Sequence, residues 1–285
     1  MNMEFKSIGV VGAGLMGAEI ALVFALAGHD VVLADQSEGS LDRARTRMAE
    51  TLAKGAARGF YSQDVADRAS ESVRAVVGLS TFTRCDFVVE AVFEDLAVKT
   101  SVIQELDRLC PETTLIATNT STIPISTLAA TVSSARAPSF VGAHFFSPAS
   151  RMRLVEVIPA FQTAPETVAA VIDLLTAAGK QPIRVKDVAG FAVNRVLHMF
   201  LIEAVRLVEE GVATPEDIDT ACRLGLGHPM GPFELMDATT SSLCLQAQEI
   251  MQEAYGERFR PRPLLKQRVR AGLVGGRGRP GWRNA

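Results

Sequence analysis

A glycine-rich segment near the N-terminus has the residue types and spacing that bind a dinucleotide. Gly12, Gly14 and Gly17 form a G-x-G-x-x-G pattern between an apolar run and an alanine-rich one. The first glycine permits a tight turn, the second lets the backbone approach a pyrophosphate, and the third lets helix and strand pack closely. The N–H groups and dipole of the following helix bind phosphates. At this turn we assign five residues to the cofactor: Gly12, Gly14, Leu15, Met16 and Gly17.

An acidic residue downstream indicates which cofactor binds. Asp35 ends the second apolar run, about 20 residues after the glycines, where a carboxylate accepts hydrogen bonds from the adenosine ribose. A carboxylate there repels a 2′-phosphate, and no arginine follows it directly, so we expect NAD rather than NADP. A flavin uses the same turn and is the main alternative, and a glycine turn without a nucleotide is the other.

Two residues farther along could form a general base. His144 follows a strand-like run, and Glu156 interrupts the apolar run 154–158. A buried carboxylate needs a partner, and two strands joined by a short loop can place these side chains together. Glu156 would then fix the imidazole tautomer and stabilise its protonated form. The alternatives are a structural histidine and a glutamate that faces solvent on an edge strand.

Small polar residues could hold the reacting oxygen. The segment 119–122, which includes Ser121, follows another strand-like run and offers hydroxyl and amide donors, although it could instead cap a helix that begins near Pro124. Asn194 lies in the middle of a long helical pattern over 191–210, where hydrogen bonding between helices is the alternative role. The four cysteines are scattered without metal-ligand spacing, so no metal site is expected.

A β-sheet could position these candidate site residues, and the hydropathy pattern predicts one. Strand-like runs alternate with helical patterns until about residue 188, after which no strand signal remains. Such alternation is typical of a parallel sheet that is covered on both faces, with ligands at the carboxyl ends of the strands. We therefore expect an α/β fold: a Rossmann-type, mostly parallel sheet with helices on both faces over 1–186, followed by an all-helical domain over 187–285.

The composition excludes several classes of protein. The 285 residues are 48% hydrophobic and 21% charged, as in soluble globular proteins. No apolar run reaches the roughly 18 residues of a membrane span, and the first residues lack the layout of a signal peptide. We expect a cytoplasmic protein without a membrane partner.

The charge is distributed unevenly. The net charge is −3, but after Glu257 the chain carries nine Lys or Arg residues and no acid. We expect this basic tail to pair with acidic surface of the same or a partner subunit, with a phosphate of the ligand as the second possibility. We do not expect nucleic acid, because the motifs described above account for the rest of the chain as an enzyme.

The motifs, in their order and spacing, resemble the L-3-hydroxyacyl-CoA dehydrogenase family, which includes the 3-hydroxybutyryl-CoA dehydrogenases. The resemblance extends to about Asp237. It rests on GAGLMG, VVEAVFEDLAVK, NTST, GAHFFSP, RLVEV, GFAVNR and GHPMGPFELMD.

This resemblance implies NAD-dependent oxidation of (S)-3-hydroxyacyl-CoA to 3-oxoacyl-CoA and the reverse reduction. His144 would be the base and Glu156 its orienting partner, while Ser121 and Asn194 would hold the 3-oxygen. Glu94, Lys99, Asn119 and Ser147 match positions near NAD. The helical domain would form a homodimer, with the acyl-CoA substrate between the domains. A basic face formed by residues 43, 47, 54 and 58 could contact CoA, and of these we select Lys54.

The sequence departs from the family pattern at four places. Ser147 replaces an asparagine, Ala189 replaces a proline, the usual Gly-Leu-Asp after Asp237 is missing, and the motif at 276–282 is rewritten. Beside the leading interpretation, two alternatives stay open. One is a dehydrogenase of a free 3-hydroxy acid, similar to gulonate or carnitine dehydrogenases, and the other is a nucleotide-binding regulatory protein.

Overall fold

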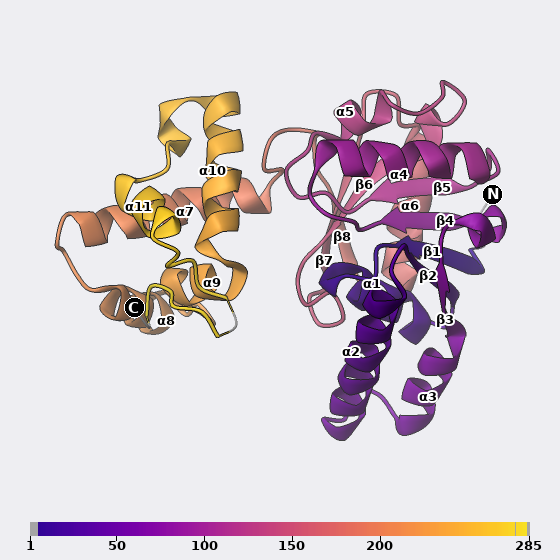
Figure 1. Ribbon diagram of the computed structural model, residues 1–285, viewed down its shortest axis with the longest axis horizontal. Coiled ribbons are helices and arrows are strands. Elements are labelled where there is room, and N and C mark those ends of the chain that lie inside the picture. Colours follow the sequence, from indigo (N-terminus) through magenta and orange to yellow (C-terminus); the bar gives the residue numbers. More distant parts are fainter. Residues whose placement is uncertain (1–4, 277, 284–285) are drawn as a thin grey trace. The chain divides into compact units, whose positions relative to one another are not determined.

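The computed structural model describes residues 5–276 and 278–283. The chain forms two compact units, the first ending at Asp187 and the second beginning at Val188 (Figure 1). Each unit is described by itself below.

The first unit is built on an eight-stranded sheet with the order β3-β2-β1-β4-β5-β6-β7-β8. All neighbouring strands are parallel except β6 and β7. The strands are β1 (Ser7–Val11), β2 (Asp30–Asp35), β3 (Val73–Val77), β4 (Phe87–Glu90), β5 (Leu115–Thr118), β6 (Phe140–Phe145), β7 (Leu154–Pro159) and β8 (Gln181–Arg184).

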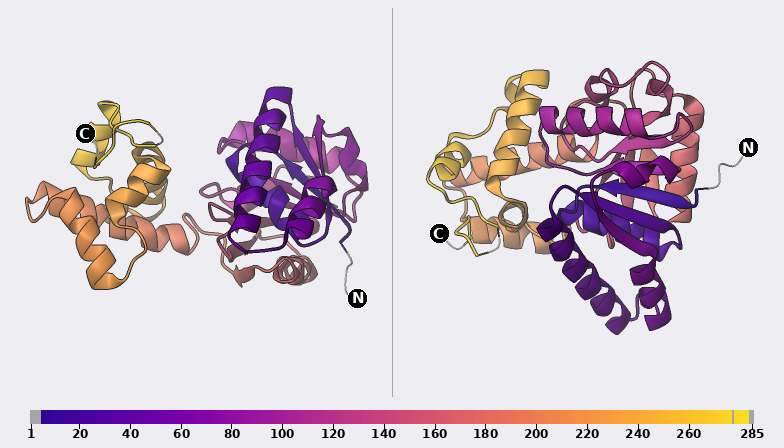
Figure 2. Two further views of the ribbon diagram at one scale, coloured as in Figure 1. Left: turned by 90° about the horizontal axis from the view of Figure 1, so that it is seen from below. Right: turned by 45° about the vertical axis from the view of Figure 1, so that its right-hand side comes forward.

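Helices cover both faces of this sheet (Figures 1 and 2). Apolar side chains of α1, α2, α3 and α6 pack on one face, and α4, α5 and the turn η1 contact the sheet elsewhere. The helical elements are α1 (Leu15–Leu26), α2 (Glu38–Ala57), α3 (Gln63–Ser72), η1 (Ser80–Arg84), α4 (Leu96–Leu109), α5 (Ile125–Ala129), η2 (Ala137–Ser139) and α6 (Pro165–Ala177).

The described residues of the second unit form helices joined by turns and loops, without a strand. Its elements are α7 (Val193–Glu209), α8 (Pro215–Leu226), α9 (Pro232–Thr239), α10 (Ser241–Tyr255), η3 (Glu257–Phe259) and α11 (Pro263–Arg270). The expected fold class, a mostly parallel α/β sheet followed by a helical region, is confirmed. Among the described residues no helix is both long and apolar enough to cross a membrane.

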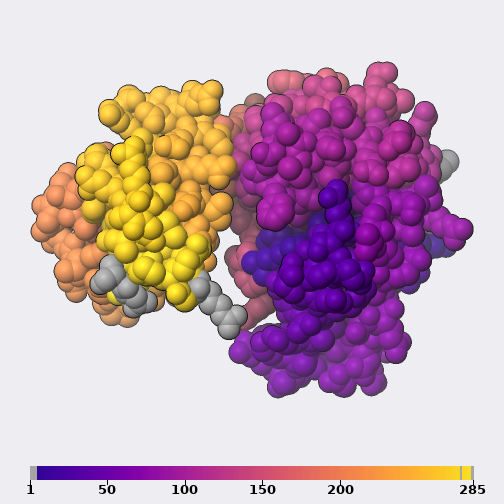
Figure 3. All heavy atoms as spheres, viewed as in Figure 1, coloured from indigo at the N-terminus to yellow at the C-terminus, as the bar shows by residue number. Residues whose placement is uncertain are grey.

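Most of the basic tail folds against its own unit (Figure 3). Arg262 pairs with Glu209, and Arg283 pairs with Glu234. Trp282 is buried in the helical core, and the guanidinium carbon of Arg268 lies 4.4 Å from the centre of its ring. Several tail cations therefore contact this chain itself, as one of the expected alternatives proposed.

Candidate functional site

The glycine turn has the geometry that each of its glycines was expected to permit. Gly12 follows β1 with a φ of +101°. A Cβ atom on Gly17 would lie 1.7 Å from the carbonyl oxygen of Gly12, so only glycine fits where α1 packs on the turn. A Cβ on Gly14 would meet nothing within 4 Å. This open space at the start of α1 is a cradle into which a pyrophosphate fits.

Asp35, at the end of β2, forms a hydrogen bond with this turn. Its Oδ2 accepts a hydrogen bond from the Ala13 N–H at 2.8 Å, and its Oδ1 accepts one from the Ser37 N–H at 3.0 Å. The chain passes outward through β1, β2 and β3 and then returns to place β4 on the other side of β1. In open α/β sheets ligands bind where the strand order reverses in this way. Both the turn and Asp35 thus lie at the expected ligand crevice.

His144 and Glu156 face each other across the antiparallel strands β6 and β7. The strand register pairs the two residues directly, and Nδ1 of His144 lies 2.8 Å from Oε2 of Glu156. Glu156 is completely buried and His144 is 5% exposed. One expectation needs correction, because β6 continues to Phe145 and His144 therefore lies inside the strand. Pairing with β7 extends β6 beyond the apolar run that marks it in the sequence.

Ser121 completes a chain of contacts with this pair. Its Oγ lies 3.1 Å from Nε2 of His144. When Nδ1 of a neutral His144 donates its proton to Glu156, Nε2 carries the lone pair. Asn119 acts from the same loop, because its Oδ1 accepts a hydrogen bond from the Phe145 N–H at 2.8 Å. The segment after β5 therefore lies against the end of β6.

The helix-capping alternative for the segment 119–122 is wrong for α5. The N–H groups of Ile125 and Ser126 donate instead to the two carboxylate oxygens of Asp187. The hydroxyls of Thr120 and Thr122 donate to Glu94. The side chains of this segment therefore do not cap α5, although its composition suggested that they could.

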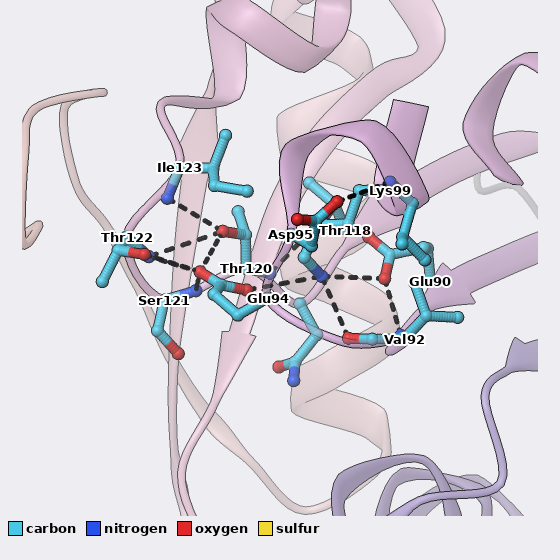
Figure 4. Close-up of polar contacts among 12 residues, drawn as sticks. Glu90, Val92, Glu94, Asp95, Lys99, Thr118, Thr120, Ser121, Thr122 and Ile123 are labelled. Carbon is cyan, nitrogen blue, oxygen red and sulfur yellow. Dashed lines mark hydrogen bonds and ion pairs between the residues drawn. The ribbon is translucent and has the colours of Figure 1, made fainter. Parts of the chain in front are cut away.

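Glu94 and Lys99 belong to a buried polar network (Figure 4). The Nζ of Lys99 lies 2.8 Å from Oε1 of Glu90 and 3.5 Å from Oε2 of Glu94. Burial raises the pKa of Glu94, but Lys99 and the threonine hydrogen bonds outweigh it, so that pKa lies below its usual range. A direct contact of Glu94 or Lys99 with NAD stays a prediction. Glu90 was not expected in the site, because its partners lie in segments that no local pattern connects.

Two other predicted residues lie on other elements. Ser147 follows β6 and is exposed. Asn194 belongs to the second unit and lies in the first turn of α7, not in mid-helix, because α7 begins only at Val193. Phe191, with a φ of +46°, interrupts the helical pattern before that point. The roles of Ser147 and Asn194 toward the ligands stay predictions.

A basic cavity of about 640 Å³ also lies in the first unit. Lys54 and Arg58 line it from the end of α2, and Arg151 and Arg153 line it from the segment that follows β6. Arg47 of the same predicted basic face instead donates from Nη1 to the Gly14 carbonyl at 3.2 Å. Lys54 thus lines this cavity together with Arg151 and Arg153, which the sequence did not connect with it because they are distant from α2 in the chain. A contact of Lys54 with CoA stays a prediction.

Comparisons with known proteins agree with this arrangement. The family model for the 3-hydroxyacyl-CoA dehydrogenase NAD binding domain matches residues 7–188, and that for the C-terminal domain matches residues 190–284. A probable 3-hydroxybutyryl-CoA dehydrogenase of Deinococcus radiodurans is 40% identical over 268 residues, which are 94% of this chain and 95% of that protein. The mitochondrial hydroxyacyl-coenzyme A dehydrogenase of Sus scrofa is 40% identical over 273 residues, 93% of this chain and 86% of its own.

Solved structures are similar as well. FadB2 of M. tuberculosis has a TM-score of 0.95 at 35% identity, covering 99% of this chain and 100% of its own. The (S)-3-hydroxybutyryl-CoA dehydrogenase PaaH1 from Ralstonia eutropha has a TM-score of 0.92 at 35% identity, covering 97% and 98%.

Proposed function

The chain belongs to the 3-hydroxyacyl-CoA dehydrogenase family, and on that premise we propose that it oxidises (S)-3-hydroxyacyl-CoA to 3-oxoacyl-CoA and catalyses the reverse reduction, with His144 as the general base. The family assignment confirms an NAD-dependent oxidoreductase, since residues 7–188 match the NAD binding domain. The observation that carries the proposal is the contact chain Glu156–His144–Ser121. His144 and Glu156 belong to the sheet whose strand β1 leads into the glycine turn.

The contact chain suits proton transfer at a hydroxyl group. Nε2 of His144 takes the proton of the C3 hydroxyl, while Glu156 holds the ring and stabilises the imidazolium that forms. Bound NAD supplies the acceptor for the hydride that leaves C3. The C3–O bond becomes a carbonyl, and in the reverse direction His144 returns the proton to that oxygen. Ser121 and Asn194 would donate hydrogen bonds to the same oxygen as its charge develops.

The basic cavity favours a CoA ester over a free acid. A free 3-hydroxy acid offers one carboxylate, whereas coenzyme A carries several phosphate groups and an adenine. Lys54, Arg58, Arg151 and Arg153 supply positive charge around a space of about 640 Å³. Phe60, 58% exposed at the same cavity, offers an aromatic face. We assign this cavity to part of the CoA moiety.

One assay distinguishes the ester from the free acid. Oxidation of NADH is followed with acetoacetyl-CoA and, separately, with free acetoacetate. We expect turnover with the ester only. Folded protein that reduces acetoacetate but not acetoacetyl-CoA would contradict the CoA ester assignment and favour the free-acid alternative.

The base assignment is tested by two substitutions. His144→Ala and Glu156→Gln should each lose at least about a hundredfold in kcat, the usual contribution of a general base, while the Kd for NADH stays within about twofold. His29→Ala is the matched control, because His29 precedes β2 at the amino end of the sheet. Near-normal kcat for His144→Ala would show that another group takes the proton.

We also propose a homodimer formed through the helical unit. Large apolar side chains are exposed there, among them Val196 at 74%, Leu224 at 83% and Leu226 at 63%. Exposed apolar surface of this kind marks interaction sites. Light scattering should give twice the 30.5 kDa chain mass, and Leu224→Asp should shift it toward the monomer. A monomeric wild-type enzyme would exclude the dimer.

A further inference from the structure

The loop after β5 is wrapped around a single carboxylate oxygen. Oε1 of Glu94 accepts hydrogen bonds from the Thr120 hydroxyl at 2.6 Å, the Ser121 N–H at 2.8 Å, the Thr122 N–H at 2.8 Å and the Thr122 hydroxyl at 2.9 Å. Figure 4 shows these donors converging on Glu94. Hydrogen bonds to an ionised acceptor are stronger than neutral ones, so Glu94 fixes the backbone of this loop.

Glu94 is itself held by a buried ion pair. Lys99 of α4 lies between Glu94 and Glu90, and the side chains of Lys99 and Glu90 are 1% and 0% exposed. The second oxygen of Glu90 accepts a hydrogen bond from the Thr118 hydroxyl at 2.7 Å. The network therefore connects the ends of β4 and β5 through α4. The fully buried pair of Glu90 and Lys99 carries a desolvation penalty, which indicates a role beyond packing.

Ser121 connects this network to His144. The backbone N–H of Ser121 donates to Glu94, while its hydroxyl points away from Glu94 (Figure 4) and lies 3.1 Å from Nε2 of His144. The backbone of Ser121 is thus held by Glu94, while its side chain contacts His144. A shift of the loop would move the hydroxyl relative to the imidazole.

We propose that Glu94 is a positioning residue, which holds the loop 120–122 so that Ser121 presents its hydroxyl to His144, and that Glu90 and Lys99 hold Glu94 in place. This inference rests on the proposed function, since it assigns Ser121 and His144 to the reacting oxygen. It differs from a cofactor contact in its consequence. A positioning role changes kcat through Ser121, whereas a cofactor contact changes the affinity for NADH.

A double-mutant cycle between Glu94→Gln and Ser121→Ala tests the proposal. The measured quantities are kcat for acetoacetyl-CoA reduction and the Kd for NADH. We expect Glu94→Gln to lower kcat about tenfold at saturating NADH, by weakening bonds to a charged acceptor, in addition to any rise in the Kd for NADH from a lost cofactor contact. In the Ser121→Ala background, the same substitution should leave kcat nearly unchanged. Equal losses in both backgrounds, or a raised Kd with normal kcat, would overturn the proposal.

Two further variants separate positioning from general destabilisation. Asp95→Asn is the matched control, because Asp95 is the adjacent acid and its carboxylate caps α4 through the Val98 N–H. It should lower the melting temperature but keep kcat. Thr122→Val removes one donor with little change of volume, and it should lower kcat about two- to threefold in the wild-type background only. An unchanged kcat for Thr122→Val would count against the loop's role.

The activity of the wild-type enzyme distinguishes a failure of the proposed function from a failure of the positioning role of Glu94. If wild-type enzyme does not reduce acetoacetyl-CoA, both the proposed function and the positioning role fail. If it does, and the effects of Glu94→Gln and Ser121→Ala multiply, only the positioning role fails.

Discussion

Arg47 and Arg58 come from one basic helix face but have different surroundings. Arg47 donates to the carbonyl of Gly14 in the dinucleotide turn, while Arg58 lines the basic cavity. Arg47→Ala should therefore raise the Kd for NADH several-fold, on the order of one lost charge-assisted contact, and leave the KM for acetoacetyl-CoA unchanged. Arg58→Ala should do the reverse.

Arg45 provides the control for this pair. It belongs to the same helix but pairs with Glu38 and Asp42 at the surface, so Arg45→Ala should change neither constant. Fluorescence titration gives the Kd and steady-state kinetics the KM. If Arg47→Ala raised only the KM of the ester, Arg47 would belong with the CoA contacts.

His198 makes the helical unit sensitive to acid. Burial alone lowers its pKa from 6.5 to about 4, and its Nδ1 has no hydrogen-bond partner among the described residues. Between those two values the unfolded chain binds a proton that the folded chain does not. Stability is therefore lost as the pH falls from 6.5 toward 4, by about 3 kcal/mol in total, and the contribution is constant above 6.5.

This dependence can be measured in the intact enzyme. Trp282 is the single tryptophan of the chain and is buried in the helical unit, so its fluorescence reports unfolding there. Urea unfolding at pH 7 and pH 4.5 should show a smaller loss of stability for His198→Leu than for the wild type. Equal losses would mean that His198 does not titrate in this way.

The sequence indicates some site residues better than others. His144 and Glu156 could be paired from sequence because each stands out in a strand, and antiparallel neighbours meet at a register position. The contacts of Lys99 with Glu90 and of Glu94 with the loop 120–122 could not, because they depend on how α4 packs above two strands. Arg151 and Arg153 were missed for the same reason: only the folded loop carries them to α2.

Strands could be predicted from the sequence where both faces of the strand are buried, because such a strand is a continuous apolar run. Strands β1 and β4, at the centre of the sheet, follow such runs closely. The sequence did not indicate α3 or β3. Strand β3 is half-buried at the sheet edge and follows α3 without a glycine or proline between them, so neither its hydropathy nor a breaker marks it.

The junction of α9 and α10 holds a strained residue. Thr240 has a φ of +89°, a conformation that β-branched side chains rarely adopt, at a cost on the order of 1–3 kcal/mol. It lies just where the sequence departs from the family's glycine pattern after Asp237. Thr240→Gly should raise the stability by about 1 kcal/mol, since the lost cap and the freer unfolded chain offset only part of the relief.

Calorimetry checks this prediction, with Thr239→Gly as the control. Thr239 is the last residue of α9, and glycine there should lower the melting temperature instead. Destabilisation by both substitutions to a similar degree would show that Thr240 stores little strain.

At the scale of the whole chain, the C-terminal tail closes the core of the helical unit. The Trp282 N–H donates to Asp237 at 2.8 Å, its Nε1 donates to the Ser241 hydroxyl at 2.9 Å, and its ring lies beside Phe233. Trp282→Ala should lower the free energy of unfolding by about 3–5 kcal/mol. Arg283→Ala, at a partly exposed ion pair, should lower it by less than about 1 kcal/mol.

Circular dichroism melting compares the two variants without relying on tryptophan emission. A melting temperature for Trp282→Ala close to that of Arg283→Ala would contradict the role of the tail in the core. Loss of the dimer in Trp282→Ala without a change in melting would point instead to a role between subunits.

The strand order also sets the distance between the glycine turn and His144. The glycine turn follows β1 and the imidazole lies near the end of β6, with β4 and β5 between them. Neighbouring strands are about 4.8 Å apart, so the turn and the imidazole are separated by about 14 Å across the sheet. A molecule whose diphosphate binds at the glycine turn must therefore be long enough to bring its reactive end to His144. A mononucleotide falls short of that span, whereas an extended dinucleotide covers it, so the number of intervening strands itself selects the length of the cofactor.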